Sequence, residues 1–143
     1  MNGLREDVSV ELLNQRGNEY LPGFLGIEML ELKANVLRSR MPIRKLHFAP
    51  NDFLHAASIV ALADTTCGYA TMAHLPDGAQ SFTTIEPKSN HLATVKEGSI
   101  VCLATSQHLG RTIQVWDAIV TDEATGRKIA LFRCTQMILW PKT

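Results

Sequence analysis

Two side chains within one apolar stretch are of types that carry out chemistry. The stretch NDFLHAASIVALADTTCGYATMAH has His55 near its start and Asp64 in its middle. A carboxylate among apolar residues costs several kcal/mol unless it is paired, hydrogen-bonded or useful. In a structural interpretation, Asp64 caps a neighbouring segment or pairs with a lysine. In a catalytic interpretation, it is a general base or a nucleophile in an apolar pocket.

His55 lies close to the start of the predicted helix, where Asn51 and Asp52 are candidate N-caps. Taken alone, a histidine here is more often a capping or surface residue. The amides of Ala56 and Ala57 fall in the first helical turn, where N–H groups have no intrahelical acceptor and the helix dipole is positive. Such amides can polarise a carbonyl oxygen and hold a developing oxyanion.

The spacing of His55 and Asp64 limits how they can cooperate. They are nine residues apart in a helix predicted over 54–73, so they point to opposite faces about 13 Å apart along the axis. One straight helix cannot bring both to one small site. If both act in catalysis, the site joins Asp64 of one subunit to the helix start of another, and a homodimer is required.

The composition excludes several other classes of protein. The 143 residues suit one domain, 1–143, and are 45% hydrophobic and 20% charged. Fourteen basic and fourteen acidic side chains give zero formal net charge, so we expect no nucleic-acid partner. Polar residues interrupt the longest apolar stretch, so we expect no membrane span. Three cysteines without a CxxC pair indicate free thiols in a reducing cytoplasm, and the five histidines show no metal-binding spacing.

The remaining sequence predicts the elements that must position these residues. An N-terminal segment, 1–20, has helical spacing over 4–16, LPGFLG then breaks the helix, and residues 27–43 predict a β-hairpin. Four strands are predicted after the central helix, at 81–95, 99–109, 111–122 and 128–140. Their short connections require antiparallel strands, which predicts a four-stranded meander. The expected fold is α+β, with one curved antiparallel sheet wrapped around one long central helix, and a dimer that continues the sheet would protect its edges.

The segment HAASIVALADTTCGYA resembles the helix of hotdog-fold acyl-CoA thioesterases, whose pattern is roughly HGG-x(6)-[DE]-x(3)-G-x-A. LPGFLGIEMLELKANVLRSRMPI resembles the opening hairpin of that family, and TTIEPKSNHLATVKEGSI resembles its next strand. The segment from HLGR to CTQMIL resembles its closing three strands. The resemblance covers about 21–139, is nearest to the PaaI-like and 4-hydroxybenzoyl-CoA thioesterase-like branch, and implies a hotdog fold.

The resemblance also implies catalytic roles. Asp64 would attack the thioester carbonyl or activate a water molecule, and the Ala56 amide of the opposite subunit would bind the thioester oxygen. His55 would shape that end of the site. Ala56 and Ala57 stand where the family has two glycines, and each adds a methyl group where a thioester must approach closely. Ala49 stands where relatives often have a polar residue, for which Asn51 is the candidate substitute.

Six further residues are candidates for substrate binding. They are Asn51, Ala57, Thr65, Asn90, His91 and Arg111. Thr65 and Thr66 either orient the carboxylate or water, or simply pack in the helix. Arg111, in the HLGR turn, either binds the phosphates of coenzyme A or is a solvated turn residue. Cys67 lies near the face of Asp64 but lacks the base that a nucleophilic thiol needs.

The sequence therefore predicts a cytoplasmic acyl-CoA thioester hydrolase that forms a homodimer and a homotetramer. It needs no cofactor, because coenzyme A is part of the substrate. One alternative is a hotdog-fold hydratase or dehydratase of enoyl thioesters. Another is a non-catalytic acyl-CoA binding protein, which the two alanines at the helix start keep open. The acyl group stays open at this stage.

Overall fold

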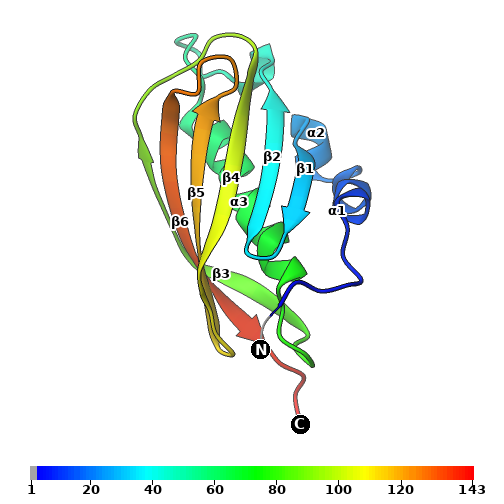
Figure 1. Cartoon of the computed structure of the whole chain (residues 1–143). Helices are drawn as coiled ribbons and strands as arrows, with labels where there is room; N and C mark the ends of the chain where they lie inside the picture. The colour runs from blue at the N-terminus through cyan, green and yellow to red at the C-terminus, as the bar shows by residue number, and fades with distance from the viewer. Residues whose placement is uncertain (1–2) are drawn as a thin grey trace.

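One six-stranded antiparallel sheet curves around one long helix in the computed structural model, which describes residues 3–143 (Figure 1). The elements in chain order are α1 (Val10–Gly17), α2 (Leu21–Leu25), β1 (Glu28–Lys33), β2 (Val36–Pro42), a 3₁₀ turn η1 (Lys45–His47), α3 (Ala56–Ala73), β3 (Ser81–His91), β4 (Ser99–Leu109), β5 (Ile113–Asp122) and β6 (Lys128–Leu139). The predicted α+β architecture is therefore confirmed, with α3 as the central helix.

The core lies between α3 and the inner face of the sheet. Side chains of β5 alternate, so that Trp116 and Val120 face inward and are fully buried. On α3, Leu62 and Cys67 are fully buried against the same core. Because α3 is apolar on most sides, it needs cover from several strands, and it contacts β2, β3, β4, β5 and β6.

The strand order is β1-β2-β4-β5-β6-β3, so the predicted meander is correct for β4–β5–β6 and wrong for β3. β3 is antiparallel, as predicted, but it pairs with β6 at the far edge of the sheet. The chain after β3 crosses the end of the sheet, where the N–H of Leu92 donates to Ile129 O and Thr94 Oγ1 accepts from Leu54 N–H. A short connection fixes relative direction but does not decide which edge a strand joins.

The two edges of the sheet are finished differently. At β1, the side chain of Asn14 takes the place of a neighbouring strand: its Nδ2 donates to Met29 O at 3.0 Å and its Oδ1 accepts from Met29 N–H at 2.7 Å. β3 is exposed along most of its length, and Ile85 on it is 52% exposed. Within residues 3–143, β3 is therefore the edge open to another strand.

The N-terminal segment differs from the prediction. The helix predicted over 4–16 begins only at Val10, because Ser9 Oγ caps the N–H of Leu12 at 3.1 Å. The break predicted at LPGFLG holds a second short helix, α2, which ends at Gly26 with a left-handed φ of 77°. Residues 1 and 2, also predicted within this segment, lie outside the described residues.

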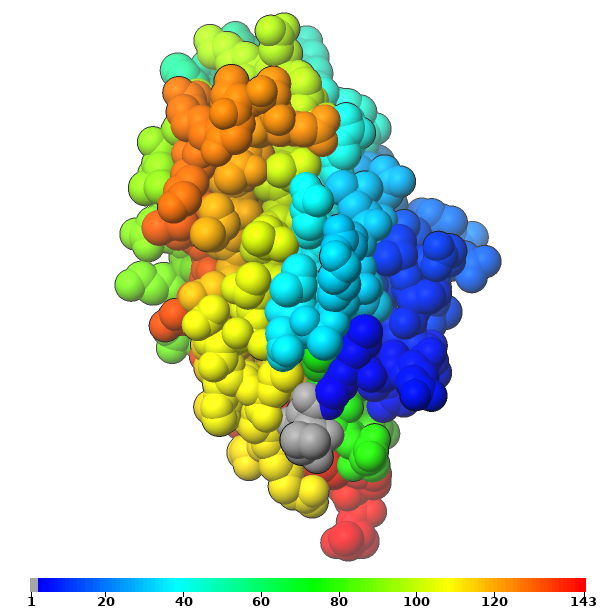
Figure 2. Space-filling view, viewed as in Figure 1, coloured from blue at the N-terminus to red at the C-terminus, as the bar shows by residue number. Residues whose placement is uncertain are grey.

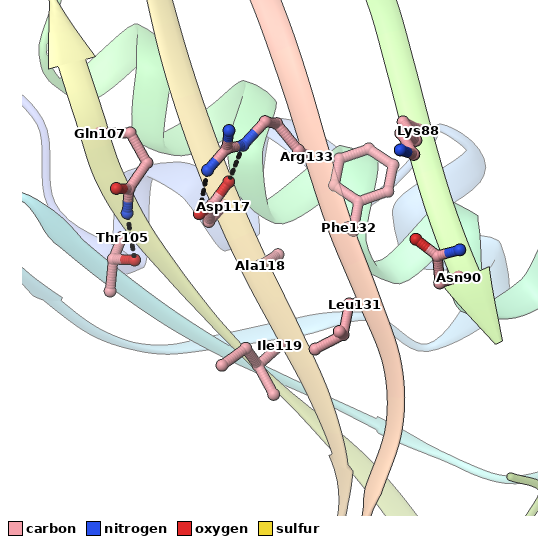
Figure 3. Close-up of a pocket in the computed structure, with 10 residues that line it drawn as sticks. All are labelled: Lys88, Asn90, Thr105, Gln107, Asp117, Ala118, Ile119, Leu131, Phe132 and Arg133. Carbon is pink, nitrogen blue, oxygen red and sulfur yellow. Dashed lines mark hydrogen bonds and ion pairs between the residues drawn. The ribbon is translucent and has the colours of Figure 1, made fainter. Parts of the chain in front are cut away.

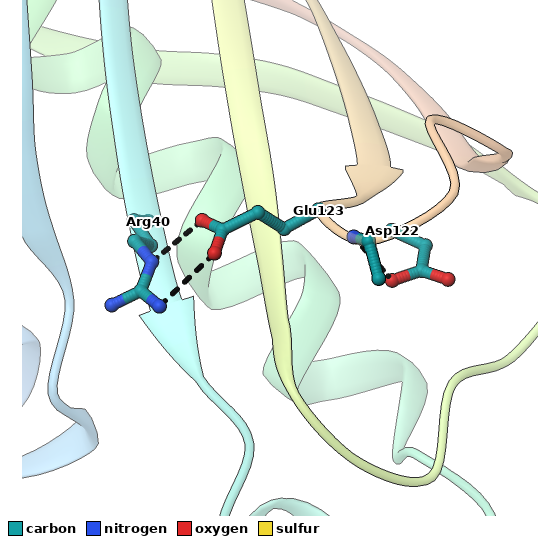
Figure 4. A network of polar contacts seen from close by, with 4 residues as sticks. Arg40, Asp122 and Glu123 are labelled. Atoms are coloured by element: carbon teal, nitrogen blue, oxygen red, sulfur yellow. Dashed lines mark hydrogen bonds and ion pairs between the residues drawn. The ribbon is translucent and has the colours of Figure 1, made fainter.

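On the outer side of the sheet, an ion pair connects β2 to the turn after β5 (Figure 4). Arg40 Nε and Nη2 donate to the Glu123 carboxylate at 2.6 and 3.1 Å, which lowers the pKa of Glu123. Asp122 holds the turn by accepting from the Ala124 N–H and the Thr125 hydroxyl. Because the pair is exposed, it fixes the turn more than it stabilises the fold.

Candidate active site

Asp64 lies in the middle of α3 and is only half-buried. Burial raises the pKa of its carboxyl group. No described residue donates a hydrogen bond to the carboxylate or pairs with it, so the cap or lysine of the structural interpretation is missing from the protomer. A partly desolvated, unpartnered carboxylate remains in the middle of the helix.

Asp64 belongs to a strip of α3 that keeps contact with solvent. We call it the open strip; its members are Ala57, Ala61, Asp64, Thr65, Gly68 and Met72. Phe82 of β3 stands on one side of the strip, since a methyl group on Gly68 would lie 3.5 Å from its ring. Four members have short side chains, so the strip leaves room for a ligand beside the carboxylate.

The two threonines after Asp64 have different surroundings. Thr66 is fully buried, and its hydroxyl donates to Leu62 O at 2.6 Å while accepting from Ser39 Oγ at 2.6 Å. Thr66 therefore packs the helix onto β2. Thr65 lies on the open strip, so it is the threonine whose hydroxyl can reach a ligand or water beside Asp64.

The central helix begins two residues later than predicted, and a different residue caps it. The N-cap is His55, whose Nδ1 accepts from the Ala57 N–H at 2.9 Å, and not Asn51 or Asp52. The chain turns sharply at Asp52, with φ of 64°, so α3 begins at Ala56. Asn51 Oδ1 instead accepts from the N–H of Phe53 at 3.2 Å.

This capping bond separates the two candidate amides. The Ala57 N–H is occupied by the His55 ring. The Ala56 N–H donates to no described atom and stands at an exposed position at the positive end of the helix dipole. Of these two amides, therefore, that of Ala56 is the one free to donate a hydrogen bond to a substrate oxygen.

α3 runs unbroken from Ala56 to Ala73, so the spacing argument holds in the structure. Eight residues separate Ala56 from Asp64, about 12 Å along the helix axis. The amide and the carboxylate of one protomer therefore cannot meet at a single carbonyl group.

The structure places Asn90 and His91, two candidates for substrate binding, on opposite faces of β3. Asn90 lines a hollow of about 460 Å³ on the outer face of the sheet, together with Lys88 and Arg133 (Figure 3). His91 is on the opposite face of β3, where its Nε2 is 3.0 Å from Ser89 Oγ. The outer hollow lies across the sheet from α3 and Asp64.

Arg111 lies in the hairpin between β4 and β5. Its guanidinium stacks on Trp140, 4.0 Å from the ring centroid, and its carbonyl oxygen accepts from Trp140 Nε1–H at 3.2 Å. The Trp140 ring also lies near Gly78, shortly after the end of α3. Arg111 is therefore near the C-terminal end of α3, whereas Asn51 and Ala57 are near its start.

The three cysteines are buried and form no disulfide. Hydrogen bonding to Cys134 and burial raise the pKa of the Cys67 thiol, and burial raises that of Cys102 to about 12. Cys67 therefore stays a thiol and has the properties of a packing residue.

Sequence reasoning missed one group of polar residues. A hollow of about 640 Å³ beside α3 is lined by Gln15, Arg16, Tyr20 and Tyr69. Nothing in the sequence places the end of α1 against α3, because the two segments are far apart along the chain. Of these four residues, Tyr69 is the one that belongs to the predicted central helix.

Two features of residues 3–143 bear on other kinds of function. No group of three or more histidine, cysteine or acidic side chains is arranged to hold a metal ion. Of the helices there, none combines the length and the hydropathy needed to cross a membrane.

Figure 2 shows the outer surface of the sheet, formed mainly by β2, β4 and β5.

A curved antiparallel sheet around one long helix defines a hotdog-fold protein. Residues 51–129 match the family model described as the thioesterase superfamily, and the chain belongs to this superfamily of enzymes. It is similar to the 1,4-dihydroxy-2-naphthoyl-CoA hydrolase of Escherichia coli, at 29% identity over 94% of this chain and 98% of the relative. It is also similar to the proofreading thioesterase EntH of Cronobacter turicensis, at 28% identity over 94% and 97%.

A solved structure agrees with these relatives. The crystal structure of thioesterase HI1161 from Haemophilus influenzae superposes with a TM-score of 0.89 at 28% identity, covering 97% of this chain and 95% of that one. The hotdog fold and the thioesterase family expected from the sequence are therefore confirmed.

Proposed function

We propose that this thioesterase hydrolyses an acyl-CoA, with Asp64 as general base or nucleophile. The observation that carries the proposal is the half-buried carboxylate on the open strip, which has a raised pKa and no partner among the described residues. A carboxylate that is structural would be paired or hydrogen-bonded at this depth. The name of the Escherichia coli relative, a hydrolase of an aryl-CoA, supports the same class of substrate.

The Ala56 N–H is the proposed oxyanion donor. It is free because His55 occupies the neighbouring amide, and it lies at the positive end of the α3 dipole. About 12 Å along the helix separates it from Asp64 in the same protomer, so the Ala56 amide must come from a partner subunit. The proposal therefore requires a homodimer with two equivalent sites.

The exposed edge of β3 supports this dimer. Its strand partner is present on one side only, whereas Asn14 closes the β1 edge. Pairing of β3 with β3 of a second copy would continue the sheet and satisfy the free backbone groups. We extend the proposal to a homotetramer through the outer face of the sheet, where Leu103, Leu131 and Met137 are each 39% exposed.

The reaction adds water across the C–S bond. As general base, Asp64 takes a proton from water, the hydroxide attacks the thioester carbonyl, and the coenzyme A thiolate leaves and is protonated. As nucleophile, Asp64 attacks the thioester carbonyl and expels the coenzyme A thiolate, which is protonated. Water then hydrolyses the mixed anhydride to the free acid and the Asp64 carboxylate. In both forms, the Ala56 N–H stabilises the oxyanion, and Thr65 orients the water or the carboxylate.

The rest of the substrate extends from this centre. His55 and Asn51 shape the end of the site at the helix start, and Ala57 narrows it with its methyl group. His91 lies near the start of α3 as well, since Thr94, three residues after it, accepts a hydrogen bond from the Leu54 N–H. Asn90 and Arg111, which lie outside the open strip, are proposed contacts of coenzyme A.

The cellular location is also part of the proposal. Three buried thiols that form no disulfide support a cytoplasmic location.

Two other functions are separated from this one by their products. A hydratase or dehydratase would change an enoyl thioester without releasing thiol. A binding protein would hold an acyl-CoA without turnover, and the methyl groups of Ala56 and Ala57 are the feature that favours it.

The test measures free-thiol release from aryl-CoAs and from straight-chain acyl-CoAs of graded length. Wild type is expected to hydrolyse some of them, and Asp64→Asn to lose about 10²-fold or more of that rate with the fold intact. If neither protein releases thiol and an acyl-CoA still binds, hydrolysis is rejected and a binding protein is favoured. Water addition to an enoyl-CoA would favour the hydratase.

A further inference from the structure

The hollow between α1 and α3 holds hydrogen-bond donors that the proposed hydrolysis does not use. We call it the α1–α3 hollow; it is lined by Gln15, Arg16, Tyr20 and Tyr69 and has a volume of about 640 Å³. Three of these residues belong to the end of α1 and the segment after it. Tyr69 belongs to α3, the helix that carries Asp64.

The charge in this hollow is positive and uncompensated. The guanidinium of Arg16 forms no ion pair with any carboxylate in residues 3–143. Burial raises the pKa of Tyr69, while the nearby charge of Arg16 acts in the opposite direction. Tyr69 therefore keeps its proton at neutral pH and remains a hydrogen-bond donor beside a cation.

The hollow borders the open strip on the side turned away from Asp64. Asp64 and Tyr69 are five residues apart in an unbroken helix, so their Cα atoms lie about 8–9 Å apart and their side chains point about 140° apart around the axis. An acyl group bound at Asp64 would have to lie across the open strip, past Thr65, to enter the hollow. Thr65 and Gly68, both on the open strip, lie between them along the helix and keep contact with solvent. The Tyr69 hydroxyl extends toward Gly17 at the end of α1, where an added methyl group would lie 2.8 Å from it.

We infer that the α1–α3 hollow receives the far end of the acyl group and selects acyl groups that end in a carboxylate. This inference rests on the proposed function. The planar guanidinium of Arg16 matches a carboxylate in two parallel hydrogen bonds, and the Gln15 amide and the tyrosine hydroxyls add donors around it. An acyl chain that ends in a methyl group gains none of these bonds.

The experiment compares two thioesters with the same number of carbons, suberoyl-CoA and octanoyl-CoA. The measured quantity is the ratio of their kcat/KM values for wild type and for Arg16→Met. The ratio is expected to fall about tenfold in the variant, the size of one charge-assisted hydrogen bond at an accessible site. Arg16→Glu is expected to lower it further, because its carboxylate repels that of suberoyl-CoA.

Two controls separate selection from damage. Lys128→Met removes an exposed cation at the start of β6, away from the hollow, and should leave the ratio unchanged. The rate with octanoyl-CoA should stay near the wild-type value in the Arg16 variants, which shows that the fold and the Asp64 site are intact.

The outcomes distinguish this inference from the proposed function. If wild type hydrolyses thioesters and the ratio is the same in wild type and both Arg16 variants, the inference is wrong and the hydrolase remains. If the ratio falls equally in Lys128→Met, general electrostatic attraction explains the preference and the inference is also wrong. If wild type releases thiol from no thioester, the proposed function itself fails.

Discussion

The side chain of His74 accepts a hydrogen bond from the backbone N–H of Asn35, with 2.9 Å between Nε2 and N. Its other ring nitrogen, Nδ1, lies 2.7 Å from Ala70 O and donates to it. His74 is fully buried at the end of α3 and packs against Trp116, with ring centroids 5.1 Å apart. The ring is therefore held neutral, because a proton on Nε2 would face the N–H of Asn35.

His47 is held in the same way at the start of the helix. Its Nδ1 accepts from the Arg44 N–H at 3.0 Å, and its Nε2–H donates to Leu25 O at 2.8 Å. Burial lowers the pKa of both histidines, and the charge of Arg44 lowers that of His47 further. The unfolded chain therefore binds protons at these sites more tightly than the folded chain does.

We predict that the free energy of unfolding falls as the pH drops below about 6.5, the pKa of histidine in an unfolded chain. Above that pH the neutral rings contribute fully, and the loss below it is at most about 1.4 kcal/mol per pH unit for each histidine. Urea unfolding from pH 8 to pH 5 measures it. His74→Gln, which keeps a donor and an acceptor, should show a shallower slope; slopes equal to wild type would contradict the assignment.

Asp64→Asn should be less active and more stable than wild type. A raised pKa means that the folded protein disfavours the charged carboxylate, so Asp64 lowers stability as the pH rises above about 3.9. Removing the charge should raise stability at neutral pH, by on the order of 1 kcal/mol. Thermal melting measures this, and a lower melting temperature would show that Asp64 has a stabilising partner.

The pH dependence of hydrolysis should report the same group. As base or nucleophile, Asp64 acts in its ionised form, so kcat/KM should rise with pH through a pKa above the ordinary value for aspartate. A profile of kcat/KM against pH below neutrality measures this rise, the acidic limb of the profile. An acidic limb at or below about 3.9 would indicate that Asp64 is not desolvated in the working enzyme.

His55 has a capping role that can be separated from a role in the site. Its ring accepts from the Ala57 N–H, so His55→Ala should cost about 1 kcal/mol of stability through loss of the N-cap. His55→Asn can cap with its side-chain oxygen and should recover most of that stability. Chemical denaturation measures both variants, and full recovery of thiol release in His55→Asn would limit His55 to capping.

Mixed dimers test whether the site is shared between subunits. Ala56→Pro removes the proposed oxyanion donor at the first helical position, where proline is tolerated and the extended backbone of His55 is compatible with it. Each homodimer, Ala56→Pro or Asp64→Asn, should be nearly inactive. Random mixing should restore about one quarter of wild-type activity, because half of the dimers are mixed and each has one intact site. No recovery would place both groups in one subunit.

The β3 edge should carry the dimer. Ile85→Lys places a charge on this exposed edge and should weaken association by about tenfold or more, with a parallel loss of activity. Leu30→Lys makes the same kind of change on β1, the edge that Asn14 closes, and is the matched control. Light scattering during gel filtration measures the mass; an unchanged mass for Ile85→Lys would reject this edge.

The sequence by itself determined the kind of fold and the identity of the central acid. Periodicity and turn residues were enough for one long apolar helix and antiparallel strands, because these depend on local spacing. Asp64 stood out because a carboxylate in an apolar helix is costly wherever the chain places it. The separation of the helix start from Asp64 also followed from the sequence, since helix geometry fixes it.

Only the tertiary structure decided what each of these groups contacts. The position of β3 beside β6 depends on which sheet edge was left open, and no local signal encodes that choice. The sharp turn at Asp52 moved the N-cap to His55 and left Ala56 with the free amide. Arg16 comes close to Tyr69 because the C-terminal end of α1 lies beside the Tyr69 side chain of α3. Such contacts join residues distant in sequence, so they are set by packing and not by local pattern.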